Sequence, residues 1–490
     1  MKKLLLILTT AVLIPYLAYG GGIVTNTNQS AAWVRTMVRD ASTDIDAVYF
    51  NPAGLTKLED GFHFSLNNQT IWQTKDVTAT YPLLMESPKL YRGEVKAPVF
   101  PSIYAAWTKG KIAVSFGFNP IGGGGGAVYN DGLFSFEKDL TLLVPSVSNA
   151  LAPLDQQILS LMGTDPLFRN ITGYGADIYF EGTSNYFGYQ LGVTYELNDM
   201  ISLAVGARFV SAKNTYSGYI RDITITAAPL NPALGGTYAP GDYIRAVGGA
   251  VGVDLSAQAA FLDAQTADRE VNAEEKGSGF TPIVGANLSF LDNKLDIGLK
   301  YEFKTIIDLN TTIIDGKDGG GLFVEGDTVH NDMPAMLSVG VDYNLLEKLT
   351  ISAGVHYYWD MGVNYGKSLD NAPDVNVGND QVMDNNYYEI GIGLEYCLAE
   401  NIYVSGGYLL GHTGVTEDYQ SDLSYSLSSS SFGVGVGIGI TKNIMLNLGG
   451  GYSIDQDQKK TQTDPVSSVP YTLEFKKKST LIGIGLDISF

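Results

Sequence analysis

Apolar and polar residues alternate along most of the chain from about residue 61 onward. In the segment 480–490, residues 482, 484, 486, 488 and 490 are all apolar, and the last of them is Phe490. A period of two predicts a β-strand with one apolar face. A strand of this kind that ends on an aromatic residue is typical of the last strand of a bacterial outer-membrane barrel. We therefore expect it to close a barrel by pairing with the first strand near Phe62, Phe64 and Leu66.

The same alternation recurs in fourteen segments, which predicts an all-β fold: a 14-stranded antiparallel transmembrane β-barrel. An even count is what a single-chain barrel with both ends on the periplasmic side requires. The segments are 61–72, 98–107, 111–119, 178–198, 200–222, 278–291, 294–313, 332–345, 348–360, 384–398, 401–411, 428–441, 443–454 and 478–490.

The connections between these segments alternate strictly between short turns and long loops. Outer-membrane barrels show this alternation, with tight periplasmic turns and long extracellular loops. Six short turns interleave with seven long loops, at 73–97, 120–177, 223–277, 314–331, 361–383, 412–427 and 455–477.

Charged residues keep to one face of the predicted strands. In the segment 294–313, Asp296, Lys300 and Glu302 share a face, and the opposite face carries apolar residues. Lys or Arg facing lipid near mid-bilayer costs about 2 to 4 kcal/mol, so the charged face must line the lumen. A soluble sandwich could imitate one such strand but not readily fourteen.

Three regions are expected along the chain. Residues 1–20 read as a signal peptide, because two lysines precede an apolar run that is followed by small residues. That run is shorter than the roughly 20 residues of a membrane-spanning helix. Residues 21–60 form a separate N-terminal segment, and residues 61–490 form the barrel with long extracellular loops. Cys397 is the single cysteine, which excludes an internal disulfide.

Composition argues against several classes of function. The net charge of −21 is unsuited to nucleic acid, whose phosphates demand a basic surface. The four histidines show no pair at metal-ligand spacing, and no nucleophile motif is present, so we expect no catalytic residue, no metal and no cofactor. Only His356 and Asp360, four residues apart on one strand face, suggest a dyad. Acidic loops could bridge to lipopolysaccharide through divalent cations, although no ligand cluster supports this.

The N-terminal segment is a candidate to fill the lumen, since fourteen strands leave an open interior unless something occupies it. Asn28 could cap a short helix whose apolar stripe begins at Trp33. The sequence Asn51-Pro52-Ala53 that follows, together with Gly54, reads as a tight turn.

At this point the chain resembles the FadL-type outer-membrane transporters of long-chain fatty acids and their relatives that take up aromatic hydrocarbons. The resemblance rests on Asn51-Pro52-Ala53 after a helical segment, on the fourteen strands, and on Asp332-Met333-Pro334 before the eighth. It implies an N-terminal hatch inside the barrel, with Asn51, Pro52 and Ala53 in the plug. An ordinary turn before the first strand is the alternative.

The third predicted strand ends in Phe118-Asn119-Pro120, and glycines follow from Gly122 to Gly126. Proline cannot donate to a strand ladder and glycine weakens it, so regular pairing is expected to fail here. The resemblance implies an inward kink that opens the wall sideways. A flexible loop that merely starts at this point is the alternative.

Segment 138–163 is too apolar for an ordinary surface loop. We expect one or two amphipathic helices, broken at Pro145 and Pro153. The resemblance implies that such loops first capture a hydrophobic substrate; alternatively, this loop and the next one pack on each other. The candidate capture residues are Leu142, Leu143, Val144, Leu151 and Leu161.

Together these features predict a monomeric, non-enzymatic barrel in the outer membrane of a Gram-negative bacterium. It would pass a hydrophobic small molecule inward, with lateral exit near the third strand. Expected partners are that ligand, outer-membrane lipid, lipopolysaccharide and the barrel-assembly machinery. A barrel that holds secreted or surface proteins, and a general porin, remain as alternatives.

Overall fold

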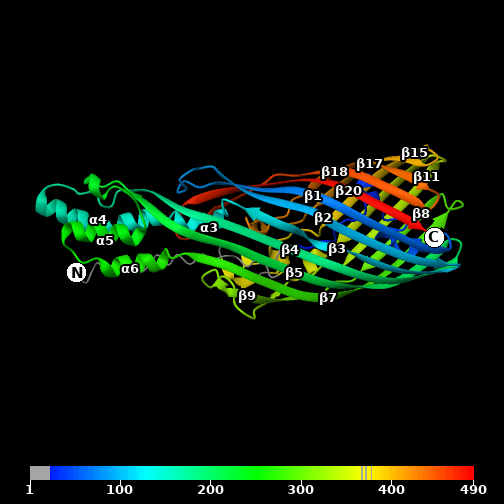
Figure 1. The fold of residues 1–490 in the computed structure, drawn as a ribbon, viewed down its shortest axis with the longest axis horizontal. Coiled ribbons are helices and arrows are strands. Elements are labelled where there is room, and N and C mark those ends of the chain that lie inside the picture. The colour runs from blue at the N-terminus through cyan, green and yellow to red at the C-terminus, as the bar shows by residue number, and fades with distance from the viewer. Residues whose placement is uncertain (1–22, 366–367, 370–371, 377) are drawn as a thin grey trace.

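The computed structural model describes residues 23–365, 368–369, 372–376 and 378–490. The predicted signal peptide, residues 1–20, lies outside the described residues. The described chain forms an elongated barrel with helices at one end and the C-terminus at the other (Figure 1).

Fourteen antiparallel wall strands form the barrel, as predicted, when three pairs of consecutive segments are each counted as one interrupted strand. The last strand pairs with the first, with Phe64 opposite Ile488 and Leu66 opposite Leu486, which closes the wall. The wall strands are β1 (Gly61–Thr80), β2 (Lys89–Lys109), β3 (Ile112–Tyr129), β4 (Ile171–Asn198), β5 (Ile201–Ala227), β7 (Arg269–Phe290), β8 with β9 (Leu295–Glu302, Asp308–Asp318), β10 with β11 (Thr328–His330, Met336–Leu346), β12 (Leu349–Tyr358), β15 (Tyr388–Ala399), β16 (Ile402–His412), β17 (Ser429–Thr441), β18 with β19 (Ile444–Asp455, Gln458–Thr463) and β20 (Pro470–Ser489).

Shorter elements complete the described structure. Strand β6 pairs with β5, and β13 pairs with β14 in a separate hairpin. These elements are α1 (Ala31–Thr36), α2 (Ala47–Phe50), η2 (Pro52–Lys57), α3 (Phe134–Leu140), α4 (Leu143–Met162), η3 (Pro232–Leu234), β6 (Gly236–Tyr238), α5 (Pro240–Val251), α6 (Ser256–Gln265), η4 (Asp360–Gly362), β13 (Ser368–Leu369), β14 (Ala372–Asn376), η5 (Asn379–Gln381) and η6 (Glu417–Tyr419).

The wall strands extend farther outward than the sequence pattern predicted. The region predicted as a loop at 73–97 is largely strand, because β1 runs to Thr80 and β2 begins at Lys89, and both ends of the predicted loop 120–177 are strand, because β3 runs to Tyr129 and β4 begins at Ile171. These extensions were missed because their outer face is polar and carries ion pairs such as Arg92–Asp76 (2.7 Å) rather than apolar residues. At about 3.3 Å per residue, the 28 residues of β4 far exceed an apolar band about 25 Å tall. The outer part of the barrel therefore stands above the membrane.

Exposed apolar side chains form a belt near the short turns. Leu191 is 64% exposed, Val205 66% and Val434 65%. Asp296, Lys300 and Glu302, in contrast, are buried inside, so the predicted division of faces is confirmed. Among the described residues, no helix is both long enough and apolar enough to span a membrane.

Residues 23–60 form the hatch, which lies inside the barrel. Helix α1 contacts β15, β16, β17, β18 and β20, and its six residues are all buried. The cap is Ser30, whose hydroxyl accepts from the Trp33 backbone N–H (3.0 Å), and not Asn28 as predicted. Asn28 instead donates to Glu389 of the wall (3.3 Å), because the helix starts two residues later than the pattern indicated.

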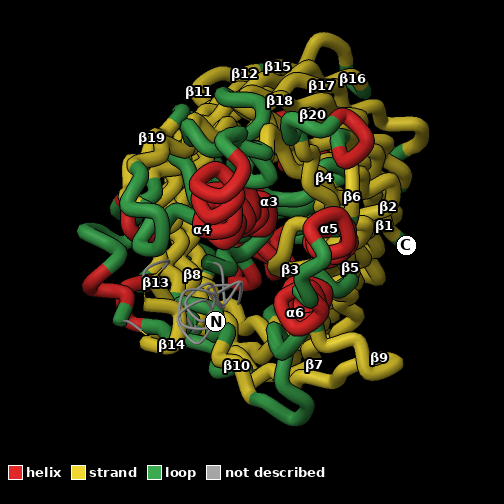
Figure 2. Tube along the Cα trace, turned by 90° about the vertical axis from the view of Figure 1, so that its left-hand side faces the viewer, coloured by secondary structure: helices red, strands yellow, loops and turns green. Residues whose placement is uncertain are grey.

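Four helices, α3 to α6, lie at the outer end of the barrel (Figures 1 and 2). The predicted breaks at Pro145 and Pro153 are wrong: α4 runs through both. Pro145 falls in the first turn, where a missing N–H costs little. Pro153 removes one hydrogen bond from the helix. Burial of the apolar face of α4 offsets this loss, because each large apolar side chain that is buried contributes about 1.5 to 3 kcal/mol.

Candidate functional site

The ladder between β2 and β3 is interrupted in mid-wall. Pairing runs to Phe118 opposite Ile103 and resumes only at Ala127 opposite Val95. Residues 96–102 of β2 and residues 119–126 of β3 therefore do not pair with each other. We call this interruption the wall gap. On its other side, β3 still pairs with β4, with register shifts around Gly122. The failure of pairing predicted at Pro120 thus concerns the β2 side.

Three prolines explain why this ladder fails. Pro120 lies on β3, and Pro98 and Pro101 lie on β2, across the gap. Each lacks the N–H that a ladder hydrogen bond needs. The prediction rested on Pro120 and the glycines alone, although Pro98 and Pro101 were visible in the sequence.

Strand β3 loses its regular in-and-out alternation at the gap. In a regular wall strand alternate residues face the lumen, but Asn119, Pro120, Ile121 and Gly122 are all buried in succession. Gly122 is needed for this path, since a Cβ there would lie 2.5 Å from the Val24 side chain of the hatch.

The wall gap lies at the level of the apolar belt. Phe118, the last paired residue before it, stacks on Phe187 with ring centroids 5.9 Å apart. The same ring lies 5.1 Å from that of Tyr189, which is 44% exposed. Val99, inside the gap on β2, is 70% exposed. Lipid-facing side chains therefore flank the interruption.

The hatch covers the wall gap from inside. The backbone N–H of Thr27 donates to the Ile121 carbonyl (3.0 Å), and the Thr27 hydroxyl donates to the Pro120 carbonyl (2.5 Å). The Gln29 amide donates to the same Pro120 carbonyl (3.2 Å). Asn119, predicted beside the opening, is buried and also donates to this carbonyl (3.2 Å). Carbonyls that the broken ladder leaves free are thus taken up by the hatch.

The predicted plug residues Asn51, Pro52, Ala53 and Gly54 are all buried between hatch and wall. The Asn51 amide donates to the Ser42 carbonyl of the hatch (3.1 Å) and to a wall side chain, and Pro52 begins η2. A Cβ on Gly54 would lie 2.5 Å from the Ser42 carbonyl oxygen, so only glycine fits this turn.

Wall side chains hold the hatch through its backbone carbonyls. Three donors, two on β4 and one on β8, reach carbonyls between residues 48 and 52. They are Gln190 to Val48 (2.6 Å), Thr194 to Pro52 (2.7 Å) and Lys300 to Tyr49 (2.8 Å).

Two buried ion clusters also join hatch and wall. In the first, Glu302 of the wall accepts from Arg208 (2.6 Å) and Lys300 (2.9 Å), and the side-chain amide of Asn26 in the hatch donates to the same carboxylate (2.8 Å). In the second, His356 lies between Asp40 of the hatch and Glu389 of the wall.

The sequence suggested His356 and Asp360 as a possible dyad, and this pairing is wrong. The Asp360 carboxylate accepts from the Tyr387 backbone N–H (2.9 Å) at the start of η4, outside β12. The partners of His356 come from residues more than thirty positions away in the chain, which strand periodicity alone cannot reveal.

At the outer end, most of the predicted capture residues serve packing. Leu143 and Leu151 are buried, Leu142 and Val144 are half-buried, and only Leu161 is largely exposed, at 76%. One apolar cluster joins this loop to the next one, so the two loops do pack on each other. Its members from these loops include Leu143, Val147, Leu151, Tyr243, Ile244, Val247, Leu255 and Leu262.

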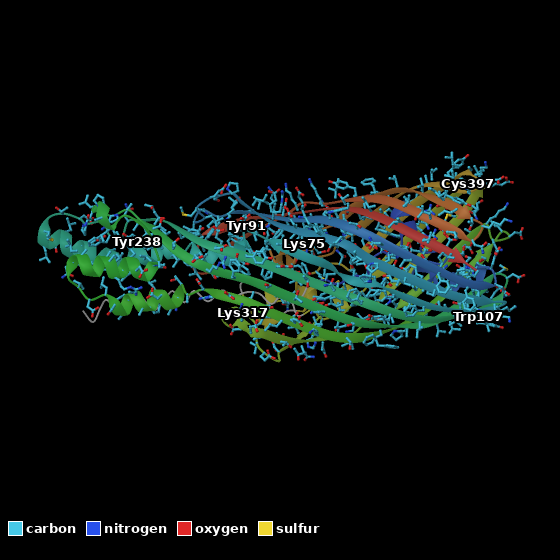
Figure 3. All side chains as sticks on the ribbon, in the orientation of Figure 1. Lys75, Tyr91, Trp107, Tyr238, Lys317 and Cys397 are labelled. Atoms are coloured by element: carbon cyan, nitrogen blue, oxygen red, sulfur yellow. The ribbon has the colours of Figure 1, made fainter. Side chains whose placement is uncertain are left out.

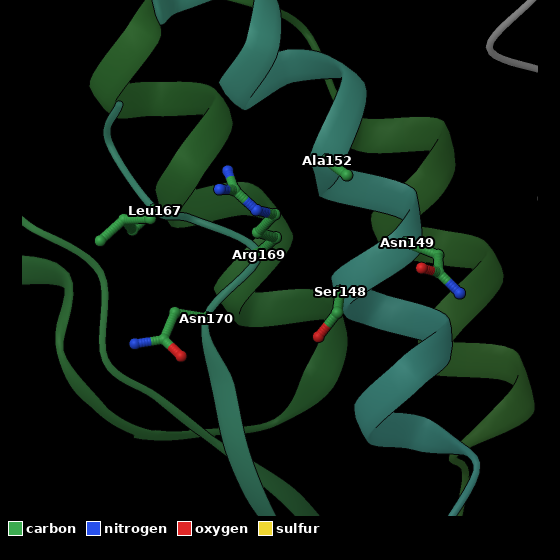
Figure 4. A pocket seen from close by; sticks show the side chains of 6 residues that line it. All are labelled: Ser148, Asn149, Ala152, Leu167, Arg169 and Asn170. Atoms are coloured by element: carbon green, nitrogen blue, oxygen red, sulfur yellow. The ribbon is translucent and has the colours of Figure 1, made fainter. Parts of the chain in front are cut away.

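A cavity of about 410 Å³ lies between α4 and the segment that leads into β4 (Figure 4). Its one cation, Arg169, is bound to Asp155 (2.8 Å) and Asp165 (2.6 Å). Its lining is a mixture of polar and apolar side chains. The lining residues are Ser148, Asn149, Ala152, Leu167, Arg169 and Asn170. Within the part of the chain that the structure describes, no group of His, Cys, Asp and Glu residues could hold a metal ion.

This architecture is similar to that of solved outer-membrane proteins. A Pseudomonas aeruginosa FadL homologue matches with a TM-score of 0.59 at 13% identity, over 96% of this chain and 100% of that one. The Pseudomonas putida toluene transporter TodX matches with a TM-score of 0.54 at 12% identity, over 96% and 99%. A TodX variant described as a monoaromatic hydrocarbon channel matches with a TM-score of 0.56 at 12% identity, over 94% and 99%. No family model and no curated protein matches the sequence. The likeness establishes the fold, a FadL-type barrel.

Proposed function

We propose that this barrel is an outer-membrane channel through which hydrophobic small molecules diffuse inward and leave sideways through the wall. The wall gap carries the proposal: a break in the β2–β3 ladder at the level of the apolar belt, covered from inside by residues Thr27 and Gln29 of the hatch. A general porin, whose wall only encloses a water-filled pore, would have no use for such a break in its ladder.

Lateral exit suits an apolar cargo for a physical reason. Such a cargo gains about 25 cal/mol for each Å² of apolar surface that leaves water, and the gap delivers it directly into the lipid. The exposed apolar end of α4, with Leu161 and Met162 each 76% exposed, offers a first contact outside the membrane. The cargo then descends the lumen to the hatch, and a small movement of residues 23–30 uncovers the gap. The likeness in fold to a toluene transporter supports this cargo class.

Restoring the ladder between β2 and β3 tests lateral exit through the wall gap. Pro98→Val, Pro101→Val and Pro120→Val together return three N–H donors to the wall. We expect the variant to lose most uptake of radiolabelled long-chain fatty acid and of toluene by cells that express it. Pro232→Val, in η3 of the outer loops, is the matched control and should take up both normally. Heat-modifiable mobility on gels checks that each barrel folds. Normal uptake by the folded triple variant would overturn lateral exit.

Deletion of the hatch distinguishes a plugged channel from a general porin. The buried hatch, held by Gln190, Thr194 and Lys300, fills the lumen, so deletion of residues 23–60 should open a large ion conductance in planar bilayers. Equal conductance with and without these residues would favour a porin.

A further inference from the structure

Four cations lie close together on the outward face of β1 and its two neighbouring strands. Lys96 is directly opposite Trp72 of β1, and Lys478 is directly opposite Thr74, two residues farther out. The even-numbered residues of this part of β1 face outward, as the 43% exposure of Trp72 shows. We call the four cations the basic patch: Arg92 and Lys96 on β2, and Lys476 and Lys478 on β20.

One charge of the basic patch is not balanced by the protein. Lys478 forms no ion pair and no side-chain hydrogen bond with any residue that the structure describes, whereas Lys317, also exposed on the outer barrel, pairs with Glu270 (2.7 Å). The other three members of the patch have acidic partners, but exposed ion pairs of this kind contribute only about 0 to 1 kcal/mol. A doubly charged anion can therefore take the place of these carboxylates. In a chain with a net charge of −21, this affinity for anions is local.

The basic patch lies at the outer edge of the apolar belt. Trp72 lies ten residues farther out along β1 than Phe62, whose partner on β2 is Trp107. Figure 3 shows Trp107 near the short turns and Lys75, three residues beyond Trp72, midway along the barrel. At about 3.3 Å per residue and a tilt of about 40°, ten residues rise about 25 Å, which is the height of the apolar band. Tryptophans are typical of both edges of that band, so the basic patch lies at the level of the lipid headgroups of the outer leaflet.

Below the basic patch, the same strands present an apolar surface to the lipid. Leu66 of β1 is 60% exposed, and Ile482 and Ile484 of β20 are 53% and 51% exposed. The β1–β20 ladder runs without a break from these residues up to the basic patch. Cations above a continuous apolar surface fit an amphiphile that has an anionic headgroup and several acyl chains.

We propose that the basic patch binds the phosphates of lipid A, the membrane anchor of lipopolysaccharide, while the acyl chains lie along the apolar surface of β1 and β20. Lipid A carries two phosphates and several acyl chains on one headgroup, so it matches both the charge and the surface. Lys478 and Lys96 would donate charge-assisted hydrogen bonds to the phosphate oxygens. Because Lys96 is also the first residue of the wall gap, the lipid would stand at the edge of the gap. This site goes beyond the proposed function and does not depend on the cargo.

Binding of fluorescent lipid A to the purified full-length protein in detergent tests the site. EDTA in the buffer keeps divalent cations from bridging the phosphates to acidic side chains. We expect saturable binding by the unaltered protein, and binding weaker by about tenfold or more when Lys96→Gln and Lys478→Gln are combined. Lys96→Arg combined with Lys478→Arg should retain binding. Heat-modifiable mobility on gels checks that each variant folds.

The matched control combines Lys109→Gln and Lys317→Gln. It changes the net charge equally, at an exposed lysine beside a short turn and at a lysine that already has an acidic partner, so its affinity should be unaltered. Equal weakening by this control would assign the effect to net charge and overturn the site. Normal binding by the folded Lys96→Gln, Lys478→Gln variant would overturn it as well.

Three further ligands separate lipid A from other occupants of the basic patch. Dephosphorylated lipid A keeps the acyl chains and should bind much more weakly; equal binding would show that the chains alone are recognised and would overturn the proposal. Phosphatidylglycerol and inorganic phosphate should displace fluorescent lipid A only weakly. Displacement by either one as effective as that by unlabelled lipid A would assign the patch to phosphate groups in general and overturn the lipid A site.

Discussion

The side-chain amide of Asn51 in the hatch donates a hydrogen bond to the side-chain oxygen of Asn287 in β7, over 2.7 Å. Both side chains are buried, and the same amide also reaches the Ser42 carbonyl (3.1 Å). One side chain thus fixes the hatch turn and ties it to the wall.

Asn51→Ala should loosen the hatch. The change removes both hydrogen bonds and leaves buried acceptors without donors, at about 1 to 3 kcal/mol for each unsatisfied group. We expect more frequent channel openings in planar bilayers and greater sensitivity of cells to bulky antibiotics. Asn401→Ala, at an exposed asparagine that bonds to the Gly439 carbonyl (3.1 Å), serves as the control. Unaltered conductance in Asn51→Ala would show that this bond does not hold the plug.

Gly407→Val should displace α1 from its seat. A Cβ at Gly407 would lie 1.8 Å from the Thr36 carbonyl oxygen at the end of the helix, so the hatch must move. Such overpacking costs about 1 to 3 kcal/mol, and conductance should rise. Gly450→Val on β18 is the matched control, because a Cβ there has nothing within 4 Å. A tight hatch in Gly407→Val would contradict the packing described here.

Acid should release the hatch. Burial alone would raise the pKa of Asp40 and Asp46, but His356 beside Asp40 and Arg39 beside Asp46 (2.8 Å) outweigh it and lower the pKa of both carboxyl groups below the ordinary 3.8. These groups stabilise the hatch above that value, and the stability is lost as the pH falls through the lowered values. Bilayer conductance should therefore stay low at pH 5 to 7 and rise below about pH 4.

Asp40→Asn is the control for the acid effect. It removes one of the two titrating groups, so the rise in conductance at low pH should become smaller, with some leak already present at neutral pH. A rise at low pH equal to that of the unaltered protein would assign the acid effect to other carboxylates.

Asp139→Asn should stabilise the outer helices at neutral pH. Burial raises the pKa of Asp139 to about 6, with Asp464 adding to the rise and Lys138 opposing it. The folded state favours the protonated carboxyl, so its stability contribution is complete below pH 3.8 and is lost as the pH rises to about 6. We expect a gain of about 1 to 2 kcal/mol at pH 7 and none at pH 4. Resistance of the outer loops to protease measures this, with Asp131→Asn at an exposed position as the control.

The sequence by itself determined the wall. A period of two needs only local information, so it located all fourteen strands and the lumen face that carries Asp296, Lys300 and Glu302. It also predicted a tight turn at Asn51 and a failure of strand pairing at Pro120, because both features can be recognised from a few consecutive residues. It missed the polar outer ends of strands such as β1 and β4, where no apolar face distinguishes strand from loop.

Only the tertiary structure decided what the lumen-facing residues meet. The sequence shows Gly407 and Gly433 only as residues without side chains on the lumen face. In the structure, the missing side chains leave room for the backbone of α1. Likewise, the pairing of His356 with Asp40 depends on where the hatch lies inside the closed barrel. Such contacts join residues hundreds of positions apart, and no local pattern encodes them.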